Sequence, residues 1–202
     1  MNRIVLYGAS GHAKVILDAL KLNNKKKVVL VDDNPAVKSL GEFEVLQPGM
    51  IDLEISDKVL VSIGNNKTRH ILAKRLKTNF FNVIHPNAII AESVKVGIGT
   101  FIAAGAVINV NSSIGNHVII NTSASIDHDC IIGNFVHVAP NATLCGGIKL
   151  GEGSFIGAGA TIIPNLEIGK WATIGAGTVV TTNVPDFAVV VGNPGRIIKT
   201  NE

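Results

Sequence analysis

A histidine followed directly by an aspartate gives the strongest signal for chemistry in this sequence. His128 precedes Asp129, and a second histidine, His137, lies nine residues further along the chain. A carboxylate beside an imidazole orients the ring and makes it more basic, which suits a general base that works near neutral pH. The alternative is a surface histidine that has an acidic neighbour and no chemical role.

A glycine-bearing turn near the N-terminus is the second candidate. Residues Gly8–His12 follow a short apolar stretch and precede apolar residues with helical spacing. The free N–H groups at the start of a helix bind anions, so this turn suits a phosphate or pyrophosphate; a plain strand–helix turn is the alternative. Two more polar loops, Asp32–Pro35 and Gly64–Lys67, follow two further apolar stretches.

The remaining histidines and the two cysteines carry less weight. We expect a structural role for His85, a solvated turn for His117, a surface helix for His70, and inert burial for Cys130. Cys145 stands beside two glycines, where it could line a pocket. Histidines that share a metal on adjacent coils need a spacing near multiples of about 18 residues, and no pair of solenoid histidines has it, so we expect no catalytic metal.

The elements that position these residues follow from a six-residue period. Every sixth residue from Ile84 to Val180 is a branched aliphatic, which is the pattern of a hexapeptide-repeat parallel β-helix. Between the inward positions Ile126 and Cys130, the histidine–aspartate pair should lie at the outer surface or at a corner. Glycine often follows the aliphatic, and a tight corner there predicts a positive φ. These glycines are Gly97, Gly115, Gly133, Gly151, Gly157, Gly169 and Gly175.

The N-terminal part has a different pattern. Residues 3–7, 28–31 and 58–63 are predicted strands, and helical spacing over 13–22 and around Ile71, Leu72 and Leu76 predicts helices. Strands that alternate with helices form a parallel sheet, whose ligands bind beyond the carboxyl ends of the strands, where the three polar loops lie. About 80 residues with about three strands is half of a dinucleotide fold, so a mononucleotide or nucleotide-sugar fits better.

Composition narrows the class of protein. With 47% hydrophobic and only 4% aromatic residues, the chain suits a solenoid core of Ile, Val and Ala layers. A net charge of +3 is too weak and dispersed to indicate nucleic acid or a membrane surface, and we expect the run Lys25–Lys27 to be a solvated loop. Two cysteines, no signal peptide and no long apolar stretch indicate reduced thiols and a cytoplasmic location.

Taken together, the motifs resemble one family over nearly the whole chain. The sequence is similar to the NeuD/PglD-type bacterial sugar O-/N-acyltransferases, which acetylate nucleotide-activated amino sugars or sialic acids. The motifs that carry the resemblance are Tyr-Gly-Ala-Ser-Gly-His (7–12), Asp32-Asp33, Ile-Gly-Asn-Asn (63–66), Asn-Thr-Ser (121–123), His-Asp-Cys-Ile-Ile-Gly (128–133), His137 and Gly-Asn-Pro-Gly-Arg (192–196). Many members have alanine where Gly195 stands.

The resemblance implies a Rossmann-like α/β domain over 1–82, followed by a left-handed parallel β-helix over 83–202. It implies His128 as the catalytic base and Asp129 as the residue that raises its basicity. It places the nucleotide-sugar at Gly8, Ser10, Gly11, His12, Asp32, Asp33, Gly64 and Asn65. It places acetyl-CoA at His137, Gly146, Ala158, Gly175, Ala176 and Arg196, in a homotrimer with sites between subunits.

The implied reaction is transfer of an acetyl group from acetyl-CoA to the amine of a nucleotide-linked 4-amino-4,6-dideoxy sugar, in bacterial surface-glycan biosynthesis. O-acetylation of sialic acid or another sugar is one alternative, because it uses the same base and cofactor. A non-catalytic scaffold or nucleotide-sugar sensor is another, and a small oxidoreductase built on the glycine turn is a third.

Overall fold

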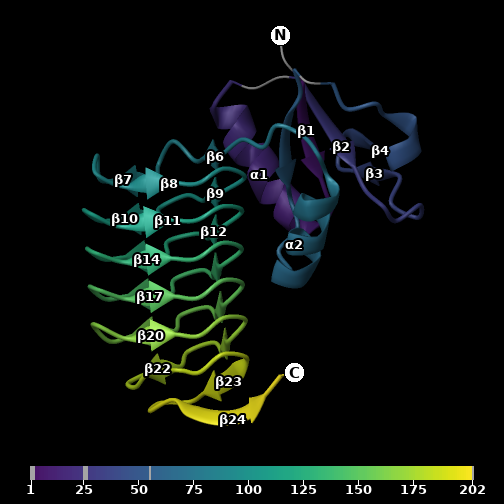
Figure 1. The fold of residues 1–202 in the computed structure, drawn as a ribbon. Coiled ribbons are helices and arrows are strands. Elements are labelled where there is room, and N and C mark those ends of the chain that lie inside the picture. The colour runs from purple at the N-terminus through teal and green to yellow at the C-terminus, as the bar shows by residue number, and fades with distance from the viewer. Residues whose placement is uncertain (1–2, 25–26, 55, 202) are drawn as a thin grey trace.

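In the computed structural model, an N-terminal α/β domain lies against one side of a long solenoid (Figure 1). The structure describes residues 3–24, 27–54 and 56–201. Lys25 and Lys26 of the predicted basic loop lie outside the described residues. Among the described residues, no helix is long and apolar enough to span a membrane.

The N-terminal domain is a five-stranded sheet in the order β3-β4-β2-β1-β5. Its elements are β1 (Ile4–Tyr7), α1 (Gly11–Leu22), β2 (Val28–Val31), β3 (Ser39–Leu40), β4 (Phe43–Leu46), the 3₁₀ helix η1 (Pro48–Met50), β5 (Lys58–Val61) and α2 (Asn66–Arg75). Strands β2, β1, β5 and β4 run parallel, and β3 pairs antiparallel with β4. The sequence analysis missed β3 and β4, which form the edge of the sheet.

The solenoid has three faces, each named here by its first strand. The β7 face contains β7 (Ile89–Ile90), β10 (Val107–Ile108), β13 (Ser125–Ile126), β16 (Thr143–Leu144), β19 (Thr161–Ile162) and β22 (Val179–Val180). The β8 face contains β8 (Lys95–Val96), β11 (Ser113–Ile114), β14 (Ile131–Ile132), β17 (Lys149–Leu150) and β20 (Glu167–Ile168). The β6 face contains β6 (Val83–Ile84), β9 (Phe101–Ile102), β12 (Ile119–Ile120), β15 (His137–Val138), β18 (Phe155–Ile156), β21 (Thr173–Ile174), β23 (Ala188–Val191) and β24 (Arg196–Thr200).

The six-residue period produces this architecture because each aliphatic points inward at the end of a short strand. Ile108 pairs with Ile126 and Ile126 with Leu144, so equivalent positions stack 18 residues apart on successive coils. These side chains form one continuous core, in which Ile126 and Leu144 are fully buried. The predicted fold class, a Rossmann-like domain followed by a parallel β-helix, is confirmed.

The predicted reason for the corner glycines is wrong. Positive φ occurs three residues after each aliphatic, at every sixth residue from Gly99 to Gly177, and not at the residue directly after it. Gly97 is glycine because a Cβ there would lie 2.6 Å from the carbonyl carbon of Gly115 on the next coil. Close approach between coils, and not backbone conformation, therefore selects glycine at these seven corners.

Candidate active site

His128 lies at the corner between the β7 and β8 faces, with its ring held by Asp129. The distance from Nδ1 of His128 to Oδ2 of Asp129 is 2.7 Å, and both side chains are more than half exposed. Asp129 occupies the positive-φ position of the corner (φ 59°), which Asp tolerates better than most residues. This contact uses Nδ1 of the ring and leaves Nε2 available to accept a proton.

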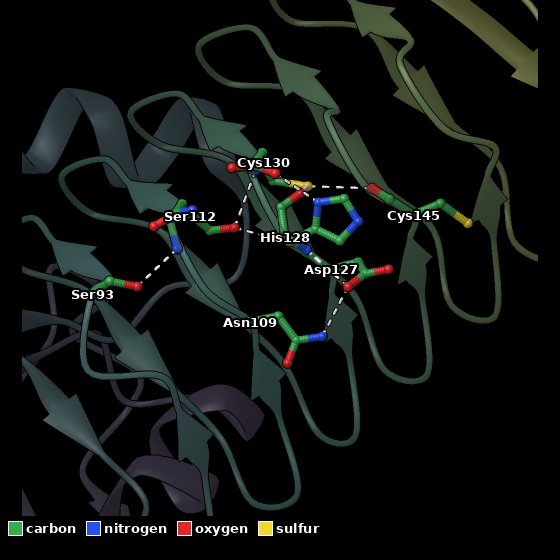
Figure 2. Close-up of polar contacts among 9 residues, drawn as sticks. Ser93, Asn109, Ser112, Asp127, His128, Cys130 and Cys145 are labelled. Atoms are coloured by element: carbon green, nitrogen blue, oxygen red, sulfur yellow. Dashed lines mark hydrogen bonds and ion pairs between the residues drawn. The ribbon is translucent and has the colours of Figure 1, made fainter.

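Asp127 and Asn109 form hydrogen bonds that hold the backbone of His128 in place. Oδ1 of Asp127 accepts the backbone N–H of His128 at 2.8 Å and the side-chain amide of Asn109 at 2.9 Å. Figure 2 shows Asn109 reaching Asp127 from the preceding coil. The sequence analysis missed both residues, although their spacing of 18 residues places them at equivalent positions on adjacent coils.

This arrangement favours a protonatable, basic ring. The hydrogen bond that His128 donates to Asp129, followed by the charge of Asp127, raises the pKa of His128. The hydrogen bond with His128 in turn lowers the pKa of Asp129. A raised pKa makes the neutral ring a stronger proton acceptor, which is what general-base catalysis needs.

Gly146 lies against the histidine ring from the next coil. A Cβ at Gly146 would lie 2.6 Å from Cε1 of His128, so the ring packs where any side chain would stand. The N–H of Gly147 donates to the carbonyl oxygen of His128 at 2.9 Å. Within the described residues, the N–H of Gly146 has no hydrogen-bond partner, so this donor remains available beside the ring.

The predicted anion site at the N-terminal turn has an open helix end. Gly8 has a φ of 113°, and a Cβ there would lie 2.4 Å from Cγ1 of Ile63, so only glycine fits. Asp32 holds the turn by accepting the N–H of Ala9 at 2.7 Å. The first turn of α1 carries no acidic residue, and its N-cap, Ser10, makes no side-chain capping bond.

Asp32 and Asp33, the predicted acidic ligands of the nucleotide-sugar, already form hydrogen bonds within the N-terminal domain. Asp33 forms an ion pair with Arg75 at 2.8 Å and accepts the hydroxyl of Tyr7 at 2.5 Å. Arg75 lowers the pKa of Asp33, while burial, reinforced by that carboxylate, raises the pKa of Tyr7 to about 12. The second carboxylate oxygen of Asp32 accepts the N–H of Asn34. Both carboxylates therefore shape this edge of the sheet.

The loop after β5 brings the N-terminal domain to the solenoid. Asn65 caps α2 by accepting the N–H of Thr68 at 2.9 Å, and the carbonyl oxygen of Gly64 lies 3.2 Å from Nδ1 of His137. The rings of His12 and His137 are 6.3 Å apart. His12 belongs to the first turn of α1 and not to the preceding loop. His137 therefore joins the predicted nucleotide site, on a different side of the solenoid from His128.

The six residues predicted to bind acetyl-CoA lie in four places. His137 lies on the β6 face, next to the loop at Gly64. Gly146 shares the corner of His128, on one edge of the β7 face. Ala158, Gly175 and Ala176 lie at corners on its other edge, which joins the β6 face. Arg196 begins β24 and is exposed. Within one chain, Gly146 is therefore separated from Ala158, Gly175 and Ala176 by the width of the β7 face.

The structure contradicts one of the expectations for the other histidines. His117 is not solvated: it is buried and stacks on Phe135 with ring centroids 5.0 Å apart, and burial lowers its pKa to about 4. His70 lies on α2, but its ring meets the edge of Phe135 at the domain junction. His85 is buried and accepts the N–H of Asn87, as a structural residue would.

The cysteines and possible metal ligands add no second centre. Cys130 is buried as predicted, burial raises the pKa of its thiol, and its Sγ lies 3.3 Å from the carbonyl oxygen of Cys145 (Figure 2). Cys145 is partly buried. Among the described residues, no group of three or more His, Cys, Asp or Glu side chains could hold a metal ion.

Comparisons with known proteins match both halves of the chain. Residues 3–76 match the model of the PglD N-terminal domain, and residues 147–182 match that of the bacterial transferase hexapeptide (six repeats). UDP-N-acetylbacillosamine N-acetyltransferase of Bacillus subtilis is 37% identical over 102 residues, which are 46% of this chain and 47% of that protein. The chain thus matches about half the length of this curated relative.

Two solved structures match nearly the whole chain. PerB from Caulobacter crescentus, in complex with CoA and GDP-perosamine, is 34% identical with a TM-score of 0.91, and the match covers 98% of each chain. The acetyltransferase domain of PglB from Neisseria gonorrhoeae, in complex with acetyl coenzyme A, is 32% identical with a TM-score of 0.92. That match covers 98% of this chain and 100% of the other.

Proposed function

The chain belongs to the PglD-type family of bacterial sugar acyltransferases, and we propose that it transfers an acetyl group from acetyl-CoA to the amine of a nucleotide-linked amino-dideoxy sugar. Its relatives support both substrates, since PerB was solved with CoA and GDP-perosamine. The observation that carries the proposal is the 2.7 Å contact between His128 and Asp129, which leaves one ring nitrogen free beside an open backbone N–H. We place the reaction in the cytoplasm, in surface-glycan biosynthesis.

In the proposed reaction, the amine nitrogen attacks the thioester carbon while Nε2 of His128 takes up the amine proton. The carbon–sulfur bond then breaks and the proton passes to the CoA thiolate, which leaves as the thiol. The N–H of Gly146 is the proposed donor to the oxyanion that forms on the way. Positioning of two bound substrates supplies much of the rate, so no covalent enzyme intermediate is required.

We propose that the nucleotide-sugar binds at the N-terminal domain. Its phosphates lie over the turn Gly8–His12, where the open N-terminus of α1 offers N–H groups to an anion. Its base lies towards Asp32 and Asp33, and the loop at Gly64 closes the site next to the solenoid. Arg75 already pairs with Asp33, so the nucleotide base can contact only the part of that carboxylate that Arg75 leaves uncovered.

The working assembly we propose is a homotrimer formed through the β7 faces. The outward residues of this face are uncharged: Ile89, Val107, Ser125, Thr143, Thr161 and Val179. The β8 face instead carries charges, including the Lys149–Glu167 ion pair at 2.7 Å, and the N-terminal domain covers the upper β6 face. Threefold packing buries the uncharged face and brings His128 of one subunit towards the nucleotide site of the next.

The pH profile of the reaction should report the His128–Asp129 pair. Only the neutral ring accepts a proton and its pKa is raised, so kcat/KM should fall on the acid side with an apparent pKa above that of an ordinary histidine. Asp129→Asn removes the largest cause of the raised pKa of His128. We therefore expect the acid limb of the kcat/KM profile to move to lower pH, and the maximal kcat/KM to fall. A limb that stays in place or moves to higher pH in the variant contradicts the pairing.

The close packing of Gly146 on the ring gives a second expectation. Gly146→Ala should displace His128 and lower kcat by about 10- to 100-fold, while the midpoint of thermal unfolding changes little because the ring is exposed. Gly49→Ala, where a Cβ meets nothing within 4 Å, is the matched control for adding a methyl group. Unchanged kcat in Gly146→Ala would show that the ring acts from another position.

A thiol-release assay tests the proposed function. Acetyl-CoA is combined with 4-amino-4,6-dideoxy sugars linked to UDP, GDP, dTDP or CMP, and free sialic acid is the comparison. We expect release with one nucleotide amino sugar. Release with sialic acid alone would instead favour O-acetylation, and binding of nucleotide-sugar without release in any reaction would favour a sensor.

A further inference from the structure

Arg69, on α2, is the largest fully buried side chain of the described residues, with 1% of its surface exposed. It crosses from the N-terminal domain into the solenoid. Its Nε donates to the carbonyl oxygen of His117 at 2.8 Å, and Nη2 donates to that of Phe135 at 2.8 Å. Its Nη1 donates to the carbonyl oxygens of Ile63 at 3.0 Å and Gly64 at 3.1 Å.

This guanidinium has no carboxylate partner among the described residues. Its remaining acceptors are Oδ1 of Asn66, at 2.9 Å, and the carbonyl oxygen of Val136. Burying a cation without an opposite charge is costly even when every N–H is satisfied. An aliphatic side chain would avoid that cost but would leave the carbonyl oxygens of His117, Phe135 and Gly64 without this donor.

Among these acceptors, the carbonyl oxygen of Gly64 is shared by two donors. Arg69 donates to it through Nη1, and Nδ1 of His137 contacts it at 3.2 Å. On the other side of the ring, Nε2 of His137 lies 3.1 Å from the side-chain amide nitrogen of Asn121. Since that amide group can only donate, Nε2 is the acceptor and the ring hydrogen is on Nδ1.

We propose that Arg69 is a positioning residue, which fixes the Gly64 carbonyl and through it the orientation and the Nδ1–H tautomer of His137. It also holds the loop after β5 to the two coils of the solenoid that carry His117 and Phe135. The link to acetyl transfer rests on the proposed function, whereas the tautomer of His137 does not.

The charges around His137 agree with this role. Arg69 and His12 are the charged and titratable groups that face the ring, and Asn121, Gly64 and Phe155 are its neutral neighbours. Burial, with the charge of Arg69 as the second cause, lowers the pKa of His137 to about 3. The ring therefore stays neutral from pH 5 to 8. Its Nδ1–H donates to Gly64 and its Nε2 accepts from Asn121 throughout this range.

Two substitutions separate the geometry of Arg69 from its charge. Arg69→Lys keeps a cation but has one nitrogen, which cannot bridge Gly64 and both coils, whereas Arg69→Met removes the charge as well. Lys74→Met, an exposed position on the same helix, is the control. The readouts are the ¹⁵N chemical shifts of the His137 ring, assigned with His137→Gln, and kcat and KM for both substrates.

In the wild type and in Lys74→Met we expect the Nδ1–H tautomer and equal kinetics. In Arg69→Lys we expect mixed tautomers and a kcat/KM for the nucleotide-sugar at least about tenfold lower, as displaced substrate-positioning groups give. In Arg69→Met the apparent pKa of His137 should also rise. Should Arg69→Met fail to fold, Arg69→Lys decides.

A folded Arg69→Lys with the wild-type tautomer and wild-type kcat/KM overturns the proposal. So does a loss of activity while the ring spectrum stays unchanged, since that result assigns Arg69 a purely structural role. If the wild type transfers no acetyl group, the proposed function fails, and the ring spectra still decide the role of Arg69.

Discussion

Replacing His128 by alanine should lower kcat for acetyl transfer by about 10²- to 10⁴-fold, the usual contribution of a general base. In the proposed reaction the ring takes the amine proton, with Asp129 on Nδ1 and, among the described residues, no hydrogen-bond partner on Nε2. Because the side chain is more than half exposed, the midpoint of thermal unfolding should stay unchanged. The measurement is thiol release under saturating acetyl-CoA, with unfolding followed in parallel.

Glu92→Ala is the matched control for this variant. Glu92 occupies the same corner position two coils before His128 and is exposed, but it has no place in the proposed chemistry. It should retain the wild-type kcat. Full transfer activity in His128→Ala would remove the base assignment, and equal losses in both variants would point to a general effect on this corner.

Thr143→Arg should break the proposed trimer into single subunits and reduce activity by at least about 100-fold, because like charges in a closed interface cost several kcal/mol. Thr143 lies in the middle of the outward column of the β7 face, between Ser125 and Thr161 on adjacent coils. Threefold packing would bring three arginines together. Without the neighbouring subunit, His128 and the N-terminal turn remain on different sides of one solenoid.

Light scattering after size-exclusion chromatography gives the subunit number for this test. The control is Ser113→Arg, which adds the same charge at the equivalent strand position of the β8 face, next to Lys95 and Ile131. We expect the control to remain trimeric and active. A trimeric and active Thr143→Arg would exclude the β7 face as the interface, and an active monomeric wild type would exclude a shared site.

The solenoid was predictable because its information is local. One inward aliphatic per six residues places every coil, so the corner position of His128 follows from its place between Ile126 and Cys130. The corner backbone was mispredicted because positive φ is tolerated there by Asn, Asp, Ser and even Phe135 and Trp171 as well as by glycine. Glycine alone therefore could not mark the left-handed position.

The junction between the domains was not predictable from local patterns. Arg69 stands among the polar residues Lys67, Thr68 and His70, where a cation usually points to solvent. Its burial, like that of His117, arises because α2 packs on coils that follow much later in the sequence. Such contacts between distant segments leave no periodic signal in the segment itself. Edge strands β3 and β4 were missed because Ser39–Leu40 and Phe43–Leu46 are short and partly polar.

The central claim is that His128 of one subunit acts on a substrate held by the N-terminal turn of its neighbour. Subunit complementation tests it with two inactive variants. His128→Ala lacks the base, and Gly11→Asp places a carboxylate where the phosphates would bind, at a position with open space around the new side chain. Asp is well tolerated at the start of a helix, so this variant should fold.

We would mix the two variants, exchange their subunits, verify mixed trimers by native mass spectrometry and measure thiol release. If each site takes His128 from one subunit and the turn from the next, random mixing restores about a quarter of the sites of a cyclic trimer. Recovery near that fraction is the result we predict. Mixed trimers that show no recovery would contradict it, because they would place the base and the nucleotide site within one chain.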